Sequence, residues 1–314
     1  MSSLRALLQA DLAGDPTAKR GVWTGLRLRQ ISARLLQVGL HVAPNTVRRL
    51  LAKLDFALHA NRKSLCSSHP ERNRQFLYIA RQRRQFSQAQ APIISVDAKK
   101  RELVGNFKNP GRVWSQQAIP VNGYDFPSLG RGVAIPYGVL DIRGKRGYIN
   151  LGTSRNTPAF AAESIRKWWL LHGRTRYPEA TRLLILADGG GSNATATNLW
   201  KHALQEKLVD PFGLFVTVCH YPTGASKWNP VEHQLFSEIS KQWAGHPLAD
   251  YPTILRLTRD TRTDSGLTVT CSLDTRRYPT GLKLTPEQRS QISLYRHAVL
   301  PAWNYTLLPN ENGN

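Results

Sequence analysis

The N-terminal part of the chain carries apolar side chains at helical spacing in two short blocks. The first block covers residues 28–36 and ends near Gly39, which suits the end of a helix. The second block covers residues 46–54 and follows Pro44 and Asn45, both good residues for a helix start. Two short helices joined by a tight turn predict a helix-turn-helix, whose second helix enters the major groove of DNA. An ordinary helical hairpin would show the same spacing.

Past Pro92 the pattern changes to apolar runs of strand length, separated by segments of helical spacing. We expect strands at residues 92–97, 137–142, 148–151, 182–187 and 213–219, and helices at residues 157–171, 193–208 and 229–243. Because strands come first and then alternate with helices, the pattern predicts an α/β fold with a sheet of mixed direction.

Two of the predicted strands lead directly into an aspartate. Asp97 ends the run 92–97, and Asp188 follows the run 182–187 and precedes three glycines. The C-terminal ends of strands are where α/β sheets usually place their sites, and glycines there would let a phosphate backbone or a metal approach closely. The alternative for each aspartate is a turn former or a helix N-cap.

A glutamate in the first turn of the predicted helix 229–243 is the third candidate acid. Asn229, Pro230 and Glu232 form a start that resembles a capping box, which is a complete structural explanation. Glu232 also shares a helical face with Leu235 and Ile239, which is unusual for a purely solvated cap. Both interpretations stay open from the spacing alone.

A second glutamate, Glu238, lies six residues later on the same predicted helix. At 100° per residue the two glutamates point about 120° apart, so both cannot reach one site. Lys241 follows Glu238 by three residues, which is typical of an exposed ion pair. We therefore expect Glu232, not Glu238, to complete the site.

The charge of the chain indicates a polyanionic partner. The sequence holds 43 lysines and arginines against 21 aspartates and glutamates, a net charge of +22, which favours nucleic acid. Residues 1–90 hold 16 basic and 4 acidic side chains, so the positive charge per residue is higher there than in the rest of the chain. We therefore expect a basic helix-turn-helix DNA-binding region at residues 1–90 and a catalytic domain at residues 91–314, with the boundary near residues 85–92.

Six basic residues are candidate DNA contacts. Arg48, Arg49 and Lys53 lie on the outer face of the second predicted helix. The other three follow or precede the candidate acids in the sequence: Lys99, Lys100 and Lys227. The alternative for each is a solvated basic face.

Several classes of protein are excluded by composition. Three cysteines, far apart and without a CxxC pair, argue against a disulfide framework and a structural zinc site. The longest aliphatic run, Leu183–Ala187, has five residues, whereas a bilayer span needs roughly 20. The first residues lack the apolar core of a signal peptide. We therefore expect a cytoplasmic protein with no membrane partner.

Several sequence blocks resemble bacterial insertion-sequence transposases and occur in the same order. The blocks are SVDAKKRELVGNFKN, LLILADGGGSN, VCHYPTGASKWNPVEHQLFSEI and the late Trp303-Asn304-Tyr305. Over nearly the whole chain the sequence is similar to the Rhodopirellula-type transposase DDE domain family. This resemblance implies an RNase H-like (retroviral integrase-like) core with an Asp, Asp, Glu triad, which falls on Asp97, Asp188 and Glu232.

The resemblance also implies cofactors and partners. The triad would hold two Mg²⁺ ions, with Mn²⁺ as a substitute and Asp97 bridging them. Water would cut the transposon end, and the freed 3′-hydroxyl would attack target DNA in the same site. The implied partner is double-stranded DNA, bound by a homo-oligomer, and the protein would be nucleoid-associated when bound.

Two other functions share parts of this pattern. An RNase H-like nuclease or junction resolvase would use the same three acids but would only hydrolyse DNA. A transposase-derived DNA-binding regulator would keep the N-terminal helices and lack activity. The helix-turn-helix pattern and the block-by-block match favour the transposase.

Overall fold

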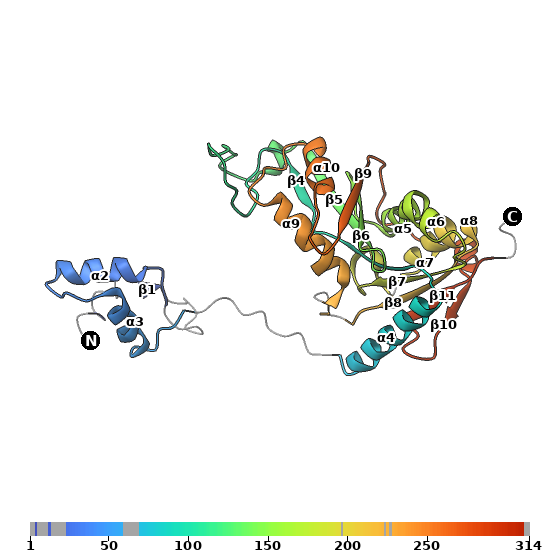
Figure 1. The fold of residues 1–314 in the computed structure, drawn as a ribbon, viewed down its shortest axis with the longest axis horizontal. Coiled ribbons are helices and arrows are strands. Elements are labelled where there is room, and N and C mark those ends of the chain that lie inside the picture. Colours follow the sequence, from blue (N-terminus) through green and yellow to red (C-terminus); the bar gives the residue numbers. More distant parts are fainter. Residues whose placement is uncertain are drawn as a thin grey trace. The chain divides into compact units, whose positions relative to one another are not determined.

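The chain divides into two compact units, Met1–Leu65 and Cys66–Asn314 (Figure 1). The computed structural model describes residues 4, 12–13, 23–58, 69–195, 197–222, 224–225 and 228–310. None of the helices in this described part has the length and apolar character that crossing a membrane requires.

The first unit is built on the two predicted helices. They are α2 (Leu28–Gln37) and α3 (Pro44–Ala52), accompanied by the short antiparallel strands β1 (Leu12–Ala13) and β2 (Trp23–Thr24). Gly39 takes a φ of +79° after α2, a conformation that glycine adopts without strain. Ile31, Leu35 and Val47 are buried between the helices, which explains the helical spacing of the apolar residues.

The second unit is built on a mixed sheet, which confirms the predicted fold class. Its described strands are β3 (Ile93–Ala98), β4 (Glu102–Val104), β5 (Gly132–Asp141), β6 (Arg146–Gly152), β7 (Arg182–Ala187), β8 (Phe215–His220), β9 (Thr268–Asp274), β10 (Leu294–Arg296) and β11 (Asn304–Leu307). Their order is β10-β11-β8-β7-β3-β5-β6-β9, and β4 pairs with β5. Strands β3, β5 and β6 pair antiparallel, and β7 and β8 continue parallel to β3, as in the RNase H-like core implied by the resemblance.

Helices cover both faces of this sheet, which is why its central strands read as continuous apolar runs. One face packs against α5 (Pro158–Trp168) and α7 (Asn198–Leu204). The other packs against a π-helical turn (Val231–Phe236), α9 (Ser237–Trp243) and α10 (Tyr251–Arg259). A short helix, α11 (Pro286–Ser290), precedes β10.

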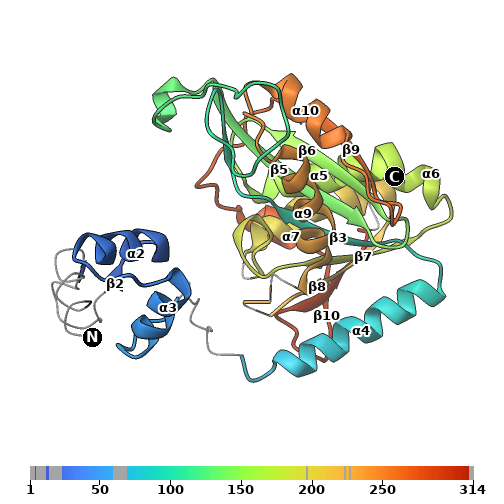
Figure 2. The same cartoon turned by 60° about the vertical axis from the view of Figure 1, so that its left-hand side comes forward.

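Helix α4 (Arg72–Gln88) belongs to the second unit and packs against β3 and β7 (Figure 2). Ile79 and Phe86 pack with Leu184 and Leu186 of β7. The domain boundary therefore lies between Leu65 and Cys66, not near residues 85–92 as the charge pattern predicted. The prediction was wrong because most arginines of α4 lie on its exposed face, and the charge pattern reflects that face and not the apolar face that packs on the sheet.

Candidate active site

The two predicted strand-end aspartates lie side by side. Strand β3 runs parallel to β7, and Val96 pairs with Ala187, so Asp97 and Asp188 leave the sheet next to each other. Asp97 is 9% exposed, and Asp188 is half-buried. The sheet therefore brings together two carboxylates that are far apart in the sequence.

The electrostatics show that Glu232 joins this pair. Burial, the charge of Asp188 and the charge of Glu232 raise the pKa of Asp97 to about 8, against a hydrogen bond of 2.7 Å from the backbone N–H of Ala98. Burial also raises the pKa of Asp188. Burial and the charge of Asp188 raise the pKa of Glu232, while a hydrogen bond from Asp97 and the charge of Lys99 oppose the rise. Three carboxylates from three elements thus share one partly buried site.

Glu232 is held in place by a contact between its turn and β3. The hydroxyl of Ser95 donates to the side-chain oxygen of Asn229 at 2.5 Å and accepts the backbone N–H of Val231 at 3.1 Å. The Asn229 side chain also donates to the carbonyl of Val96 at 3.5 Å. The capping-box interpretation required the Asn229 side chain to accept a backbone N–H of its own helix. Instead, the hydroxyl of Ser95 in β3 accepts the N–H of Val231, so Asn229 does not cap the helix.

Asp188 is held by a histidine that the sequence did not point to. Nδ1 of His220 donates to the backbone carbonyl of Asp188 at 2.9 Å, and Nε2 lies 3.2 Å from the hydroxyl of Tyr305. Because the carbonyl can only accept, Nδ1 carries a proton; in the neutral ring Nε2 is then the acceptor, and Tyr305 donates to it. Burial favours this neutral form and lowers the pKa of His220 to about 4.

The loop after Asp188 is fastened at two further points. Tyr137 donates to the side-chain oxygen of Asn193 at 2.8 Å, and Lys201 donates to the carbonyl of Thr195 at 2.8 Å. A Cβ placed on Gly190 or Gly191 would meet no described heavy atom within 4 Å. The loop is thus fixed at its far end, while the glycines leave open space beside Asp188.

In the sequence, His220 and Tyr305 lie within blocks that resemble the family, but no local pattern assigns either residue a role. Ser95 and Tyr137 lay inside predicted strands and carried no separate signal. The only sequence signal was a polar residue at a position that the apolar pattern would bury, as Ser95 is in the run 92–97.

A basic pocket of 590 Å³, which starts two residues after Asp97 in the chain, contains two of the predicted DNA contacts, Lys99 and Lys100, together with the acidic residues Glu102 and Asp125. Arg101 and Lys108 also line it. Lys99 pairs with Glu102 at 3.1 Å, and its Nζ lies 5.0 Å from the centroid of the Trp243 ring. Lys227 lies outside the described residues.

The donor set fits a hard divalent cation. Within the described ranges, no group of three His, Cys, Asp or Glu side chains surrounds a point closely enough to hold a metal ion by itself. Mg²⁺ keeps several waters and binds through one or two carboxylates together with substrate phosphates, so a preformed cage is not what it needs. The charges of Asp188 and Glu232 raise the pKa of Asp97, and a bound cation would offset this repulsion.

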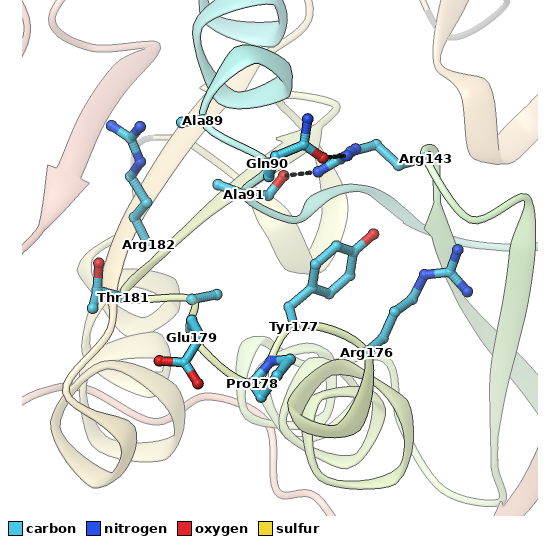
Figure 3. A pocket seen from close by; sticks show the side chains of 11 residues that line it. Ala89, Gln90, Ala91, Arg143, Arg176, Tyr177, Pro178, Glu179, Thr181 and Arg182 are labelled. Atoms are coloured by element: carbon cyan, nitrogen blue, oxygen red, sulfur yellow. Dashed lines mark hydrogen bonds between the residues drawn. The ribbon is translucent and has the colours of Figure 1, made fainter.

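A second pocket, of 510 Å³, lies at the opposite ends of β3 and β7 from the aspartates (Figure 3). Its three arginines are engaged within the fold. Arg176 pairs with the buried Asp141 at 3.2 Å, Arg143 donates to Gln90 and to the carbonyl of Ala91, and Arg182 lies 5.2 Å from the centroid of the Phe86 ring. The carboxylate end of the sheet is therefore the candidate active site.

The remaining predicted contacts lie in the first unit. Arg48, Arg49 and Lys53 are exposed, and Val47 between the helices is buried, so the basic face of α3 points to solvent as expected.

Known proteins give the following matches. The family described as Rhodopirellula transposase DDE domain matches residues 3–309. Solved structures of the mariner transposase Mos1 are similar: a paired-end complex with the left transposon end (15% identity, TM-score 0.43), a strand transfer complex (15%, 0.44) and a paired-end complex with Mg (13%, 0.41). Each covers 81% of this chain and 68% of the Mos1 chain. No curated protein sequence matches the chain.

Proposed function

Because the chain belongs to the Rhodopirellula transposase DDE domain family, we propose that it is a DNA transposase that breaks and joins phosphodiester bonds at Asp97, Asp188 and Glu232. The observation that carries the proposal is the convergence of these carboxylates: the pairing of Val96 with Ala187 places Asp97 beside Asp188, and the side chains of Asp97 and Glu232 are hydrogen-bonded. Like charges are kept together at a cost in stability, which is typical of a site that binds cations.

The three carboxylates would hold two Mg²⁺ ions, or Mn²⁺ in their place. When bound, the metal supplies Lewis acidity that activates the attacking oxygen and stabilises the leaving oxygen. Asp97 and Glu232, which hydrogen-bond to each other, would bind the cation in their ionised form, because its positive charge would offset the repulsion between the carboxylates. Ser95 holds the turn that carries Glu232, and His220 holds the backbone of Asp188.

The reaction has two steps at one site. In the first, water attacks the phosphorus at a transposon end, and the 3′-oxygen leaves and is protonated to a 3′-hydroxyl. In the second, that hydroxyl attacks a phosphodiester of the target, so one bond forms as another breaks. Lys99 and Lys100 of the basic pocket bind the phosphates next to the acids by charge.

The basic face of α3 supplies the second DNA contact. We propose that Arg48, Arg49 and Lys53 bind duplex DNA as the second helix of a helix-turn-helix, and that Lys227 contacts DNA near Glu232. We also propose a homo-oligomer on DNA, as the family resemblance implies.

A strand-transfer assay with a labelled DNA end that carries a 3′-hydroxyl tests the proposal. Joining of the label to target DNA in Mg²⁺ is the expected result, and Asp97→Asn is the inactive control. Cutting without joining would favour the nuclease or resolvase, and DNA binding without either reaction would favour the regulator. Ca²⁺ should permit binding with little chemistry, whereas full cleavage in excess EDTA would contradict the metal mechanism.

A further inference from the structure

A pocket lined by rings and a guanidinium lies at the start of α4. Its volume is 450 Å³, and it is lined by His69, Pro70, Arg72, Asn73, Phe76 and Trp228. The guanidinium carbon of Arg72 lies 4.5 Å from the centroid of the Trp228 ring. The rings of Phe76 and Trp228 meet edge-on with their centroids 5.7 Å apart. Trp228 nevertheless remains 42% exposed, so part of a large ring is open to a ligand.

The lining selects the chemistry of that ligand. None of these six side chains is acidic, and Arg72 brings a positive charge. Rings and a guanidinium suit a flat π system better than the branched aliphatic side chains of an apolar peptide. Aromatic platforms of this kind bind nucleobases with little regard to sequence, because every base has a π face. The chemistry therefore fits a nucleobase carried on an anionic strand.

The pocket shares a chain segment with one of the candidate carboxylates, because Trp228 lies four residues before Glu232. Trp228 precedes Asn229, whose side chain bonds to Ser95 of β3. The backbone N–H of Glu232 donates to the carbonyl of Asn229 at 3.0 Å. A strand that places a phosphodiester at the acids can therefore bring a neighbouring base to Trp228. Bases inside a duplex are stacked and cannot enter, so the base must be unpaired or extruded.

We infer that this pocket binds one unpaired nucleobase of the DNA strand whose phosphodiester lies at the carboxylates. The inference rests on the proposed function, because it needs DNA at the acids. Arg72 covers one part of the indole and adds a cation–π contact, and Trp228 provides the stacking surface.

The test uses the full chain in Ca²⁺ and two DNA hairpins that carry 2-aminopurine at the same position; they differ only in the opposite strand, which pairs with the 2-aminopurine in one hairpin and leaves it unpaired in the other. We expect the chain to bind the unpaired probe roughly 5- to 100-fold more tightly and to quench its fluorescence by stacking. Trp228→Ala should lose both effects, whereas Trp228→Phe keeps a ring and should retain most of the preference. Tyr295→Ala is the matched control, since Tyr295 is an aromatic residue of β10 with 61% exposure that does not line the pocket.

Each outcome decides the matter. If Trp228→Ala keeps the preference and the quenching, the pocket does not bind the base. If the native chain binds paired DNA and joins strands but shows no preference for the unpaired probe, this inference fails and the proposed function stands. If the native chain binds neither hairpin, both fail.

Discussion

The hydroxyl of Ser95 donates to the side-chain oxygen of Asn229 at 2.5 Å and ties the strand of Asp97 to the turn of Glu232. Both residues are fully buried, where a lost hydrogen bond is not replaced by one to bulk water. The spacing between the first and third carboxylates therefore depends on a contact that neither carboxylate makes.

Removing this contact should reduce cleavage more than DNA binding. Ser95→Ala leaves Asn229 and the N–H of Val231 without their partner, so we expect the free energy of unfolding to fall by about 1–3 kcal/mol. Denaturant unfolding, a cleavage assay and DNA affinity measure the three effects. Ser237→Ala is the control, because that hydroxyl donates to the carbonyl of His233 within its own helix. Normal cleavage by Ser95→Ala would contradict the positioning role.

The glutamates of the π-helical turn and of α9, Glu232 and Glu238, should differ sharply. Glu238 pairs with Lys241 at 2.6 Å on the surface, as the spacing predicted, and such a pair contributes roughly 0.5 kcal/mol. Glu238→Gln should therefore have little effect on stability, cleavage or joining. Glu232→Gln keeps the size of the side chain and removes its charge, so folding and DNA binding should stay near normal while cleavage and joining are lost. An active Glu232→Gln beside an inactive Glu238→Gln would reverse the assignment.

Neutralising Asp97 should stabilise the metal-free protein. Its pKa rises from 3.8 to about 8 on folding, so the folded state holds the proton more tightly and stability falls as pH rises through this range. Asp97→Asn removes that loss, and its Tm should exceed that of the native chain most clearly above pH 8, by roughly 2–4 °C per kcal/mol. Added Mg²⁺ should raise the Tm of the native chain more than that of the variant. A variant less stable than the native chain at this pH would contradict the expectation.

The buried His220 should make the protein sensitive to acid. Burial lowers its pKa from 6.5 to about 4, so between these values the unfolded chain binds a proton that the folded chain does not. Stability should therefore fall as pH drops from about 6.5 to 4, by at most about 1.4 kcal/mol per pH unit for one group. Denaturant midpoints of the native chain and His220→Gln, measured over this range, isolate the contribution of this group. Parallel curves would show that His220 does not titrate in this way.

The basic face of α3 should account for salt-dependent DNA binding. Replacing Arg48 and Arg49 with alanine should weaken binding to the terminal sequence and reduce the slope of log K against log salt by about 0.9 for each lost phosphate contact. Folding should be unaffected, because both side chains are exposed. Fluorescence anisotropy at several salt concentrations measures the slope, and Arg29→Ala on α2 is the control for the loss of one exposed arginine, to be compared with Arg48→Ala and Arg49→Ala singly. An unchanged affinity would reject α3 as the helix that reads DNA.

Local patterns in the sequence determined the main elements and the candidate acids. Strands β3 and β7 are buried on both faces, so each reads as an unbroken apolar run, and the acid at the end of each run stands out. Pro44 and Gly39 mark the ends of the N-terminal helices through their own backbone preferences. These signals act within a few residues, which is why they can be read without the fold.

Only the tertiary structure decided what holds the acids in place and where the units divide. His220 meets Tyr305 because β8 pairs with β11, and Ser95 meets Asn229 because the π-helical turn Val231–Phe236 packs onto β3. Such contacts depend on strand register and helix packing between residues far apart in the chain, so no short sequence pattern predicts them. Tertiary packing also determines the unit to which α4 belongs. Its charged face dominates the sequence pattern, but its apolar face packs against the sheet of the second unit.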